Sequence, residues 1–235
     1  MTTVETNIMK ISKETLDILK NYSTINSNII IPEGNEIATL SPMKNIMSLA
    51  SVTETFENEI AIWDLNKFLG TISLYDKPIF EFNEDHVIIS EENGKTRTKY
   101  RYAESQLIQR VTQRVKMDDV VVSFELRNKD LSQVLRAASV LQLPDLAVRT
   151  SESGDSIELV ALDSKDSTCN TYSVDLGELP NDGHDFEFFF KTENMKMLPG
   201  DYNIEISKKM VCQMKNQNSD LSYWIALESN SRYED

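Results

Sequence analysis

Two short amphipathic stretches of this sequence begin alike and lie 116 residues apart. The first, SKETLDILKNYS, runs from Ser12 to Ser23, and the second, NKDLSQVLRAAS, runs from Asn128 to Ser139. Each starts with a residue suited to a helix N-cap, places an acid in its first turn, and repeats apolar residues at helical spacing. Because the same helix begins twice, we expect two similar domains.

The order of the other elements supports this duplication. Strand-like runs follow each helix, and a second short helix is then predicted over 64–72 in the first half and over 191–199 in the second. Each half closes with further alternating strands. The sequence therefore predicts an α+β fold with a first domain over 1–116 and a second over 117–235, joined by a connector at about 103–120.

Cations occupy matching positions in the two longer helices. On a wheel of 100° per residue, Lys13 and Lys20 lie roughly 150 to 170° from the centre of the apolar stripe. Lys129 and Arg136 stand at the same positions of the second helix. The formal charge is −14, yet the four predicted helical segments together carry +2. Solvated helices often carry lysines, but the repeated placement favours helices that present positive charge to DNA.

Several kinds of chemistry lack a signature in the sequence. The two cysteines, Cys169 and Cys212, and the two histidines, His86 and His184, show no metal-ligand spacing. None of the seven glycines belongs to a phosphate-binding loop. No basic leader precedes an apolar run, and no stretch reaches the length of a membrane span. We therefore expect a soluble, unexported protein without a cofactor, metal or membrane partner.

Five blocks, in this order, resemble the sliding clamp of T-even-type tailed phages, the DNA polymerase processivity factor. They are MKISKETLDILKNYSTINSNI, AIWDLNKFLGTISL, KDLSQVLRAASVLQLPDLAV, NMKMLPGDYN and YWIALES. The resemblance implies two clamp domains, each with two helices packed on antiparallel β-sheets, and a homotrimeric ring. It implies a non-enzymatic protein that encircles double-stranded DNA without reading its sequence, in the cytoplasm of an infected bacterial host.

The resemblance also implies partners and sites. The partners are a replicative DNA polymerase, a clamp-loader ATPase and, as in related phages, late-transcription factors. The residues expected to face DNA are Lys13, Lys20, Lys67, Lys129, Arg136, Lys191 and Lys196. A pocket for partner tails is expected at Leu143, Pro144, Trp224 and Ile225, although burial in the core explains these residues equally well. Strand edges near Leu107–Val115 and Thr171–Leu176 are expected to join the subunits.

Two departures from the family pattern and two alternative functions stay open at this stage. The chain carries an N-terminal extension, Met1–Ile8, and the region Lys77–Leu126 lacks a Pro-rich connector. One alternative is a tandem-domain structural or adaptor protein that does not encircle DNA. The other is a metal-dependent nuclease that would use acidic patches, namely Phe82–His86, Glu91–Asn93 and Met117–Asp119.

Overall fold

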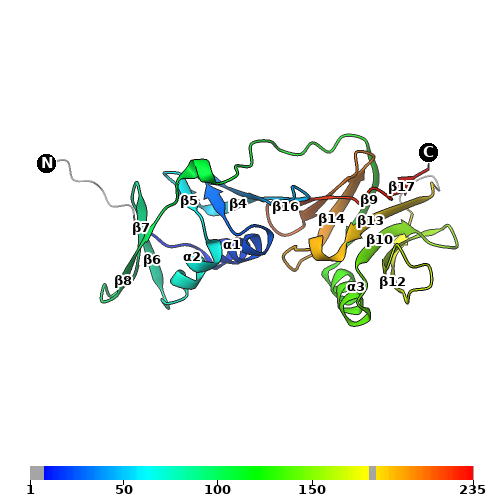
Figure 1. Cartoon of the computed structure of the whole chain (residues 1–235), viewed down its shortest axis with the longest axis horizontal. Helices are drawn as coiled ribbons and strands as arrows, with labels where there is room; N and C mark the ends of the chain where they lie inside the picture. Colours follow the sequence, from blue (N-terminus) through cyan, green and yellow to red (C-terminus); the bar gives the residue numbers. More distant parts are fainter. Residues whose placement is uncertain (1–7, 180–183, 235) are drawn as a thin grey trace. The chain divides into compact units, whose positions relative to one another are not determined.

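The chain divides into two compact units in the computed structural model, which describes residues 8–179 and 184–234 (Figure 1). The first unit comprises residues 1–42 and 48–113, and the second comprises 43–47 and 114–235. The expected N-terminal extension lies outside the described residues except for Ile8, which opens the first strand.

The first unit combines two helices with antiparallel strands. A four-stranded sheet has the order β1 (Ile8–Met9), β6 (Pro78–Phe82), β7 (His86–Glu91) and β8 (Arg97–Arg101). The remaining strands are β2 (Ile29–Ile31) paired with β5 (Ile60–Ile62), and β3 (Gly34–Leu40) beside β4 (Ile46–Phe56). The helices are α1 (Lys13–Ile25) and α2 (Leu65–Ile72), and a 3-10 turn, η1 (Ser105–Leu107), follows the last strand.

The second unit contains one α-helix, α3 (Asn128–Leu141), and a 3-10 turn, η2 (Thr192–Asn194), within its described residues. A five-stranded antiparallel sheet has the order β12 (Tyr172–Glu178), β11 (Ser156–Leu162), β10 (Asp145–Thr150), β13 (Phe186–Lys191) and β17 (Arg232–Tyr233). The other strands lie in the order β16 (Leu221–Ala226), β15 (Val211–Asn216), β14 (Tyr202–Ser207) and β9 (Val120–Leu126).

The two longer helices bury the stripes that their sequences predict. Helix α1 buries Ile18, Leu19 and Tyr22, and the Tyr22 hydroxyl donates to the Ile37 carbonyl and accepts from the Ser48 hydroxyl. Helix α3 buries Leu131, Val134 and Ala138 at the corresponding positions. The fold is α+β with the expected pair of long helices, and the predicted short helix over 64–72 is present as α2.

The prediction of a short helix over 191–199 is wrong. The backbone makes only the 3-10 turn η2 there, and the Leu198 amide donates to the Tyr223 hydroxyl at 3.2 Å rather than to a helical carbonyl. Pro199 disfavours a helical conformation at the residue before it. Gly200 then passes so close to Asn216 that a β-carbon at position 200 would lie 2.5 Å from the side-chain nitrogen of Asn216. Tertiary contacts therefore replace the second helix of this unit.

The two longer helices start differently. Ser12 caps α1 as predicted, because its hydroxyl accepts from the Thr15 amide at 3.1 Å. Asn128, predicted as the cap of α3, is instead its first helical residue, and the N-cap residue Arg127 makes no side-chain cap hydrogen bond. The Asn128 amide donates to the Asp201 carboxylate at 2.7 Å, so a distant acid serves as the acceptor.

A distant acid also holds the start of α1. Glu54 on β4 is only 7% exposed. One of its carboxylate oxygens accepts from the Ser12 amide, and the other accepts from the Thr15 hydroxyl at 2.5 Å. Burial alone would raise the pKa of Glu54, but these hydrogen bonds outweigh it and lower the pKa below its usual value. A carboxylate near a helix N-terminus also complements the helix dipole.

We expect Glu54→Gln to destabilise the first unit by about 1–3 kcal/mol at pH 7, because a buried charged hydrogen-bond acceptor is lost. The folded-state pKa of Glu54 lies below its unfolded value of 4.5. Its stabilising contribution is therefore complete above that value and disappears as the pH falls through the folded pKa. Urea unfolding followed by circular dichroism at pH 7 and pH 3 should show a smaller loss of stability on acidification in Glu54→Gln than in the original chain. The exposed Glu57→Gln is the control, and equal losses in all three proteins would contradict the assignment.

Candidate nucleic-acid interface and partner pocket

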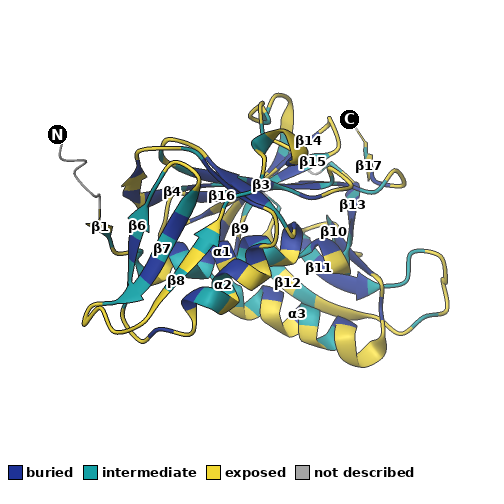
Figure 2. Ribbon diagram, turned by 60° about the vertical axis from the view of Figure 1, so that its left-hand side comes forward, coloured by how far each residue is buried: buried dark blue, intermediate teal, exposed yellow. Residues whose placement is uncertain are grey.

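Five of the cations expected to face DNA lie exposed on the three α-helices. They are Lys13 and Lys20 on α1, Lys67 on α2, and Lys129 and Arg136 on α3. Figure 2 shows exposed residues along the outward side of α3. Lys20 forms an exposed ion pair with Asp17 at 3.2 Å, which contributes little because water screens it. The helix positions that the sequence paired are thus solvent-facing within both units.

Lys191 and Lys196 differ from these five. The Lys191 ammonium group lies 2.5 Å from the Asp145 carboxylate, whose side chain is 1% exposed. This bond raises the pKa of Lys191. Asp145 also accepts from the amide and hydroxyl of Ser164, at 3.0 and 2.6 Å. Lys191 therefore neutralises a buried acid, and Lys196 is half-buried just beyond η2.

Arg127 is an exposed cation that sequence reasoning missed. It stands at the N-cap of α3, two residues before Lys129. The signal for it in the sequence is a positive charge immediately before the predicted helix.

The four residues expected to form a partner pocket do not line a common hollow. Leu143 and Pro144 line a shallow hollow with residues of α3 and η2, and neither Trp224 nor Ile225 borders it. Trp224 and Ile225 are consecutive residues of β16, so their side chains point to opposite faces of the sheet. Both are buried, whereas Pro144 is exposed.

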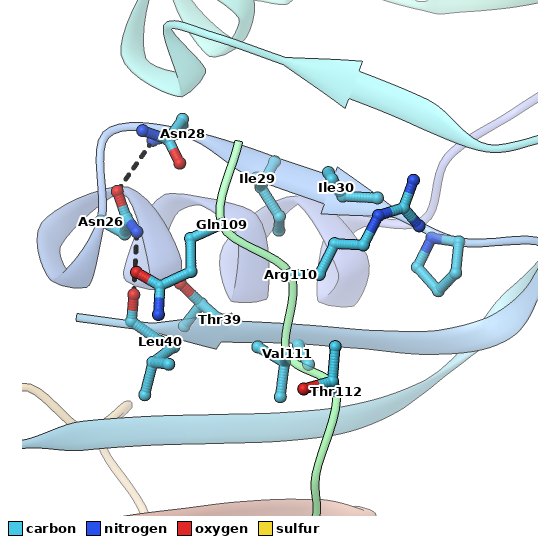
Figure 3. Close-up of a pocket in the computed structure, with 12 residues that line it drawn as sticks. Asn26, Asn28, Ile29, Ile30, Thr39, Leu40, Gln109, Arg110, Val111 and Thr112 are labelled. Carbon is cyan, nitrogen blue, oxygen red and sulfur yellow. Dashed lines mark hydrogen bonds between the residues drawn. The ribbon is translucent and has the colours of Figure 1, made fainter. Parts of the chain in front are cut away.

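A more enclosed hollow lies within the first unit (Figure 3). It has a volume of about 230 Å³, and an apolar floor is provided by Ile29, Ile30, Pro32, Ala38 and Leu40. The rest of its lining comes from Asn26, Asn28, Thr39 and the chain segment Gln109–Thr112. The Asn26 side chain bridges the two sides of the floor, since it donates to the Leu40 carbonyl at 2.8 Å and accepts from the Asn28 amide at 3.2 Å.

The segment Gln109–Thr112 crosses this hollow in an extended conformation (Figure 3), and it is held by bonds from Arg110 within it and from Ser105 just before it. Arg110 donates two hydrogen bonds to the Glu59 carboxylate at 2.5 and 2.7 Å, and Ser105 donates a third at 2.7 Å. These bonds lower the pKa of Glu59. Ile108 is buried against Ile30 and Ala61. This hollow was missed from the sequence, where its only signal was the apolar run NIIIP.

The subunit-joining strand expected over Leu107–Val115 is also wrong, because that segment forms no strand. Leu107 ends η1, and irregular backbone continues until β9 begins at Val120. The other expected edge, Thr171–Leu176, lies almost wholly within β12, which is an edge strand of its sheet.

The acidic patches pair with nearby cations. Asp118 and Asp119 lie 2.9 and 3.8 Å from the Lys209 ammonium group, and Asp85 lies 2.9 Å from the Arg101 guanidinium group. Among residues 8–179 and 184–234 no three His, Cys, Asp or Glu side chains gather in a way that could hold a metal ion. The helices in that part of the chain are all too short or too polar to cross a membrane.

Comparisons with known proteins agree with this architecture. A family model described as the gp45 sliding clamp, C terminal, matches residues 123–229. The sliding clamp of Vibrio phage KVP40 is 30% identical over 224 residues, which cover 94% of this chain and 100% of the relative. That of Enterobacteria phage T4 is 27% identical over 232 residues, covering 96% of this chain and 100% of the relative.

Solved structures share the fold at lower identity. The A. fulgidus PCNA bound to the C-terminal region of FEN-1 has a TM-score of 0.69 at 13% identity, with 96% of this chain and 98% of that chain covered. The H. pylori beta clamp in complex with 5-chloroisatin has a TM-score of 0.66 at 13% identity, with 97% of this chain and 68% of that chain covered. With two α+β units, a repeated pattern of exposed helical cations and a phage relative matched over its whole length, this chain belongs to the sliding-clamp family.

Proposed function

We propose that three copies of this chain close into a ring around duplex DNA, with the two units of each copy as its clamp domains. The observation that carries this proposal is the repeated placement of exposed cations on α1 and α3. Lys13 corresponds to Lys129, and Lys20 corresponds to Arg136, in a chain whose net charge is −14. Positive helices in an acidic protein direct the phosphate backbone to one surface and away from the others.

The number of these cations suits a ring that slides. Each phosphate contact displaces counterions and adds affinity, so a dense basic surface would hold DNA in place. Five exposed helical cations in each copy, one of them already paired with Asp17, give a weak attraction without base-reading contacts. Retention then comes from encirclement rather than from affinity.

The protein is proposed to act without catalysis. It tethers a replicative DNA polymerase, and a separate clamp-loader ATPase opens and loads the ring, since the sequence carries no nucleotide-binding loop. Late-transcription factors are proposed as further users of the same ring. The phage relatives are sliding clamps, which supports the proposed role in tethering a polymerase.

The hollow beside Gln109–Thr112 is proposed to receive the apolar tail of a partner, in place of the pocket expected around Leu143. At about 230 Å³ it is smaller than the 300–1,000 Å³ typical of small-molecule sites, and it suits one or two inserted side chains. The fastening of Arg110 to Glu59 keeps the crossing segment in position, so the tail meets a largely preformed site.

Encirclement predicts that DNA ends control retention. After loading, the protein should remain on closed circular DNA and leave the same DNA within minutes once it is cut to a linear form. Gel filtration of labelled protein measures its retention on the circular DNA and its loss from the linear DNA. Blocking the ends of the linear DNA with bound protein should restore retention. Equal loss from circular and linear DNA would exclude encirclement, and a tandem-domain adaptor would then be favoured.

Reversing the matched helix cations should impair loading without breaking the ring. We expect the double variant Lys13→Glu with Lys129→Glu to reduce clamp-dependent polymerase synthesis on the order of tenfold, because six charges around the DNA change sign. The control is Lys165→Glu with Lys215→Glu, which reverses two exposed lysines outside the helices. Light scattering should give the same mass for all three proteins. Unchanged synthesis by the helix variant would show that these helices do not face DNA.

Filling the hollow should block partner tails alone. Ala38 lines the hollow on β3, whereas Asn35 on the same strand is exposed and does not line it. We expect Ala38→Arg to weaken binding of the replicative polymerase at least about tenfold, since the added side chain occupies the space proposed for the partner tail. Asn35→Arg should leave the dissociation constant unchanged. Calorimetry measures both, and full affinity in Ala38→Arg would move the tail site elsewhere.

A further inference from the structure

The four-stranded sheet of the first unit presents a row of cations on its outward face. Strand β8 has the sequence RTKYR, in which alternate side chains point to opposite faces of the sheet. Thr98 points inward, where its hydroxyl lies 2.6 Å from that of Tyr75. Tyr100 also points inward, where its ring packs against that of Phe68 with a centroid distance of 5.0 Å. The outward side chains are all exposed, and they are Arg97, Lys99 and Arg101.

Two of these cations have no acid as a partner in the described part of the chain. Arg101 is paired with Asp85 at 2.9 Å. Among residues 8–179 and 184–234, Arg97 and Lys99 form no ion pair. This local positive charge contrasts with a net charge of −14 for the whole chain. The fold therefore leaves positive charge available at this face of the sheet.

Isoleucines lie beside the cations. The strand register places Ile88 of β7 directly beside Lys99. Ile79 of β6 and Ile8 of β1 lie on the same face through the register of the neighbouring strands. Ile79 and Ile88 are half-buried, and Ile8 is 61% exposed. We call the three cations and the two half-buried isoleucines the outer strip; its residues are Ile79, Ile88, Arg97, Lys99 and Arg101.

Acids lie at both ends of the outer strip. The hairpin between β7 and β8 carries Glu91 and Glu92, and the turn before β7 carries Glu84 and Asp85. Cations two residues apart on a strand are separated by roughly 6.6 Å, so the row spans about 13 Å. A nucleic-acid strand is charged at every phosphate and would meet these acids as it left the strip. A short acidic peptide would not, and its apolar residues could also cover the isoleucines.

We propose that the outer strip binds a short acidic segment of a partner protein, in which three carboxylates at alternate positions of an extended chain meet the three cations. Alternate residues of an extended chain repeat at the same distance as the cations of β8. Clusters of basic side chains commonly bind acidic motifs, and the unpaired Arg97 can hold one carboxylate through two parallel hydrogen bonds. The site uses side chains on the face of the sheet and none of the backbone groups at its edge.

The outer strip is separate from the other sites of the first unit. None of its residues lines the hollow beside Gln109–Thr112, and the cations that we propose face DNA lie on helices rather than on this sheet. An acidic segment at the strip and a partner tail in the hollow therefore occupy different residues. Binding at the strip depends neither on encirclement nor on DNA, so its absence would leave the proposed ring standing.

The experiment measures fluorescence anisotropy of a labelled synthetic peptide in which three glutamates alternate with two valines. The original chain should bind it at 50 mM salt and at least about tenfold more weakly at 500 mM salt, because salt screens exposed charges. Arg97→Glu with Lys99→Glu should lower the affinity at least about tenfold, since unlike pairs become like pairs. Arg97→Gln with Lys99→Gln only removes the charges and should lower it by less. Lys165→Glu with Lys215→Glu reverses two exposed lysines elsewhere and is the matched control.

Four results would overturn the assignment of the outer strip to an acidic segment. The first is a failure of the original chain to bind the peptide at 50 mM salt. The second is equal affinity in the Arg97→Glu, Lys99→Glu variant and the control. The third is displacement of the peptide by oligodeoxythymidylate at equal charge, which would make the strip a nucleic-acid site. The fourth is a lower mass of that variant by light scattering, which would place the strip in a contact between copies.

Discussion

The hydrogen bonds between a distant carboxylate and the start of a helix are the constraint on which the rest of this molecule depends. Glu54 holds the first turn of α1, and Asp201 holds the first amide of α3. In each unit a helix is thereby fastened at one end to the strands behind it. The apolar stripe then determines which face is buried, and the cations are left on the opposite face. Both units therefore hold a helix start with a distant carboxylate, although the residues differ.

A protein that slides on DNA must attract it without gripping it. We propose that the attraction is divided among a few exposed helical cations, whereas two other cations serve the structure of the protein itself. Lys191 compensates the buried Asp145, and Arg110 fastens the segment beside the hollow. Because Asp145 is buried, removing Lys191 would leave its charge unpaired in the protein interior, which costs more than losing an exposed pair. The exposed helical cations are the ones that we propose meet phosphates.

The sequence predicted features that depend on neighbours along the chain. Ser12 was identified as a cap, the stripes of α1 and α3 were placed correctly, and the duplicated α+β plan followed from them. Predictions from the sequence failed where a residue distant along the chain determines the local structure. Asp201, rather than Asn128, accepts the hydrogen bond at the start of α3. The Leu198 amide donates to the Tyr223 hydroxyl instead of to a helical carbonyl. The hollow under Gln109–Thr112 is lined by residues about 70 positions apart in the sequence, and a local sequence pattern cannot predict that they lie together.

The close passage of Gly200 beside Asn216 has a consequence for two separate parts of the second unit. The Gly200 amide donates to the Asn128 side chain at 3.3 Å, at the start of α3. Asn216 accepts from the Asn218 amide and the Ser219 hydroxyl at 2.9 and 3.0 Å, in the turn between β15 and β16. Any side chain at position 200 would displace the Asn216 side chain. A single glycine therefore keeps a helix start and a hairpin turn in their relative positions.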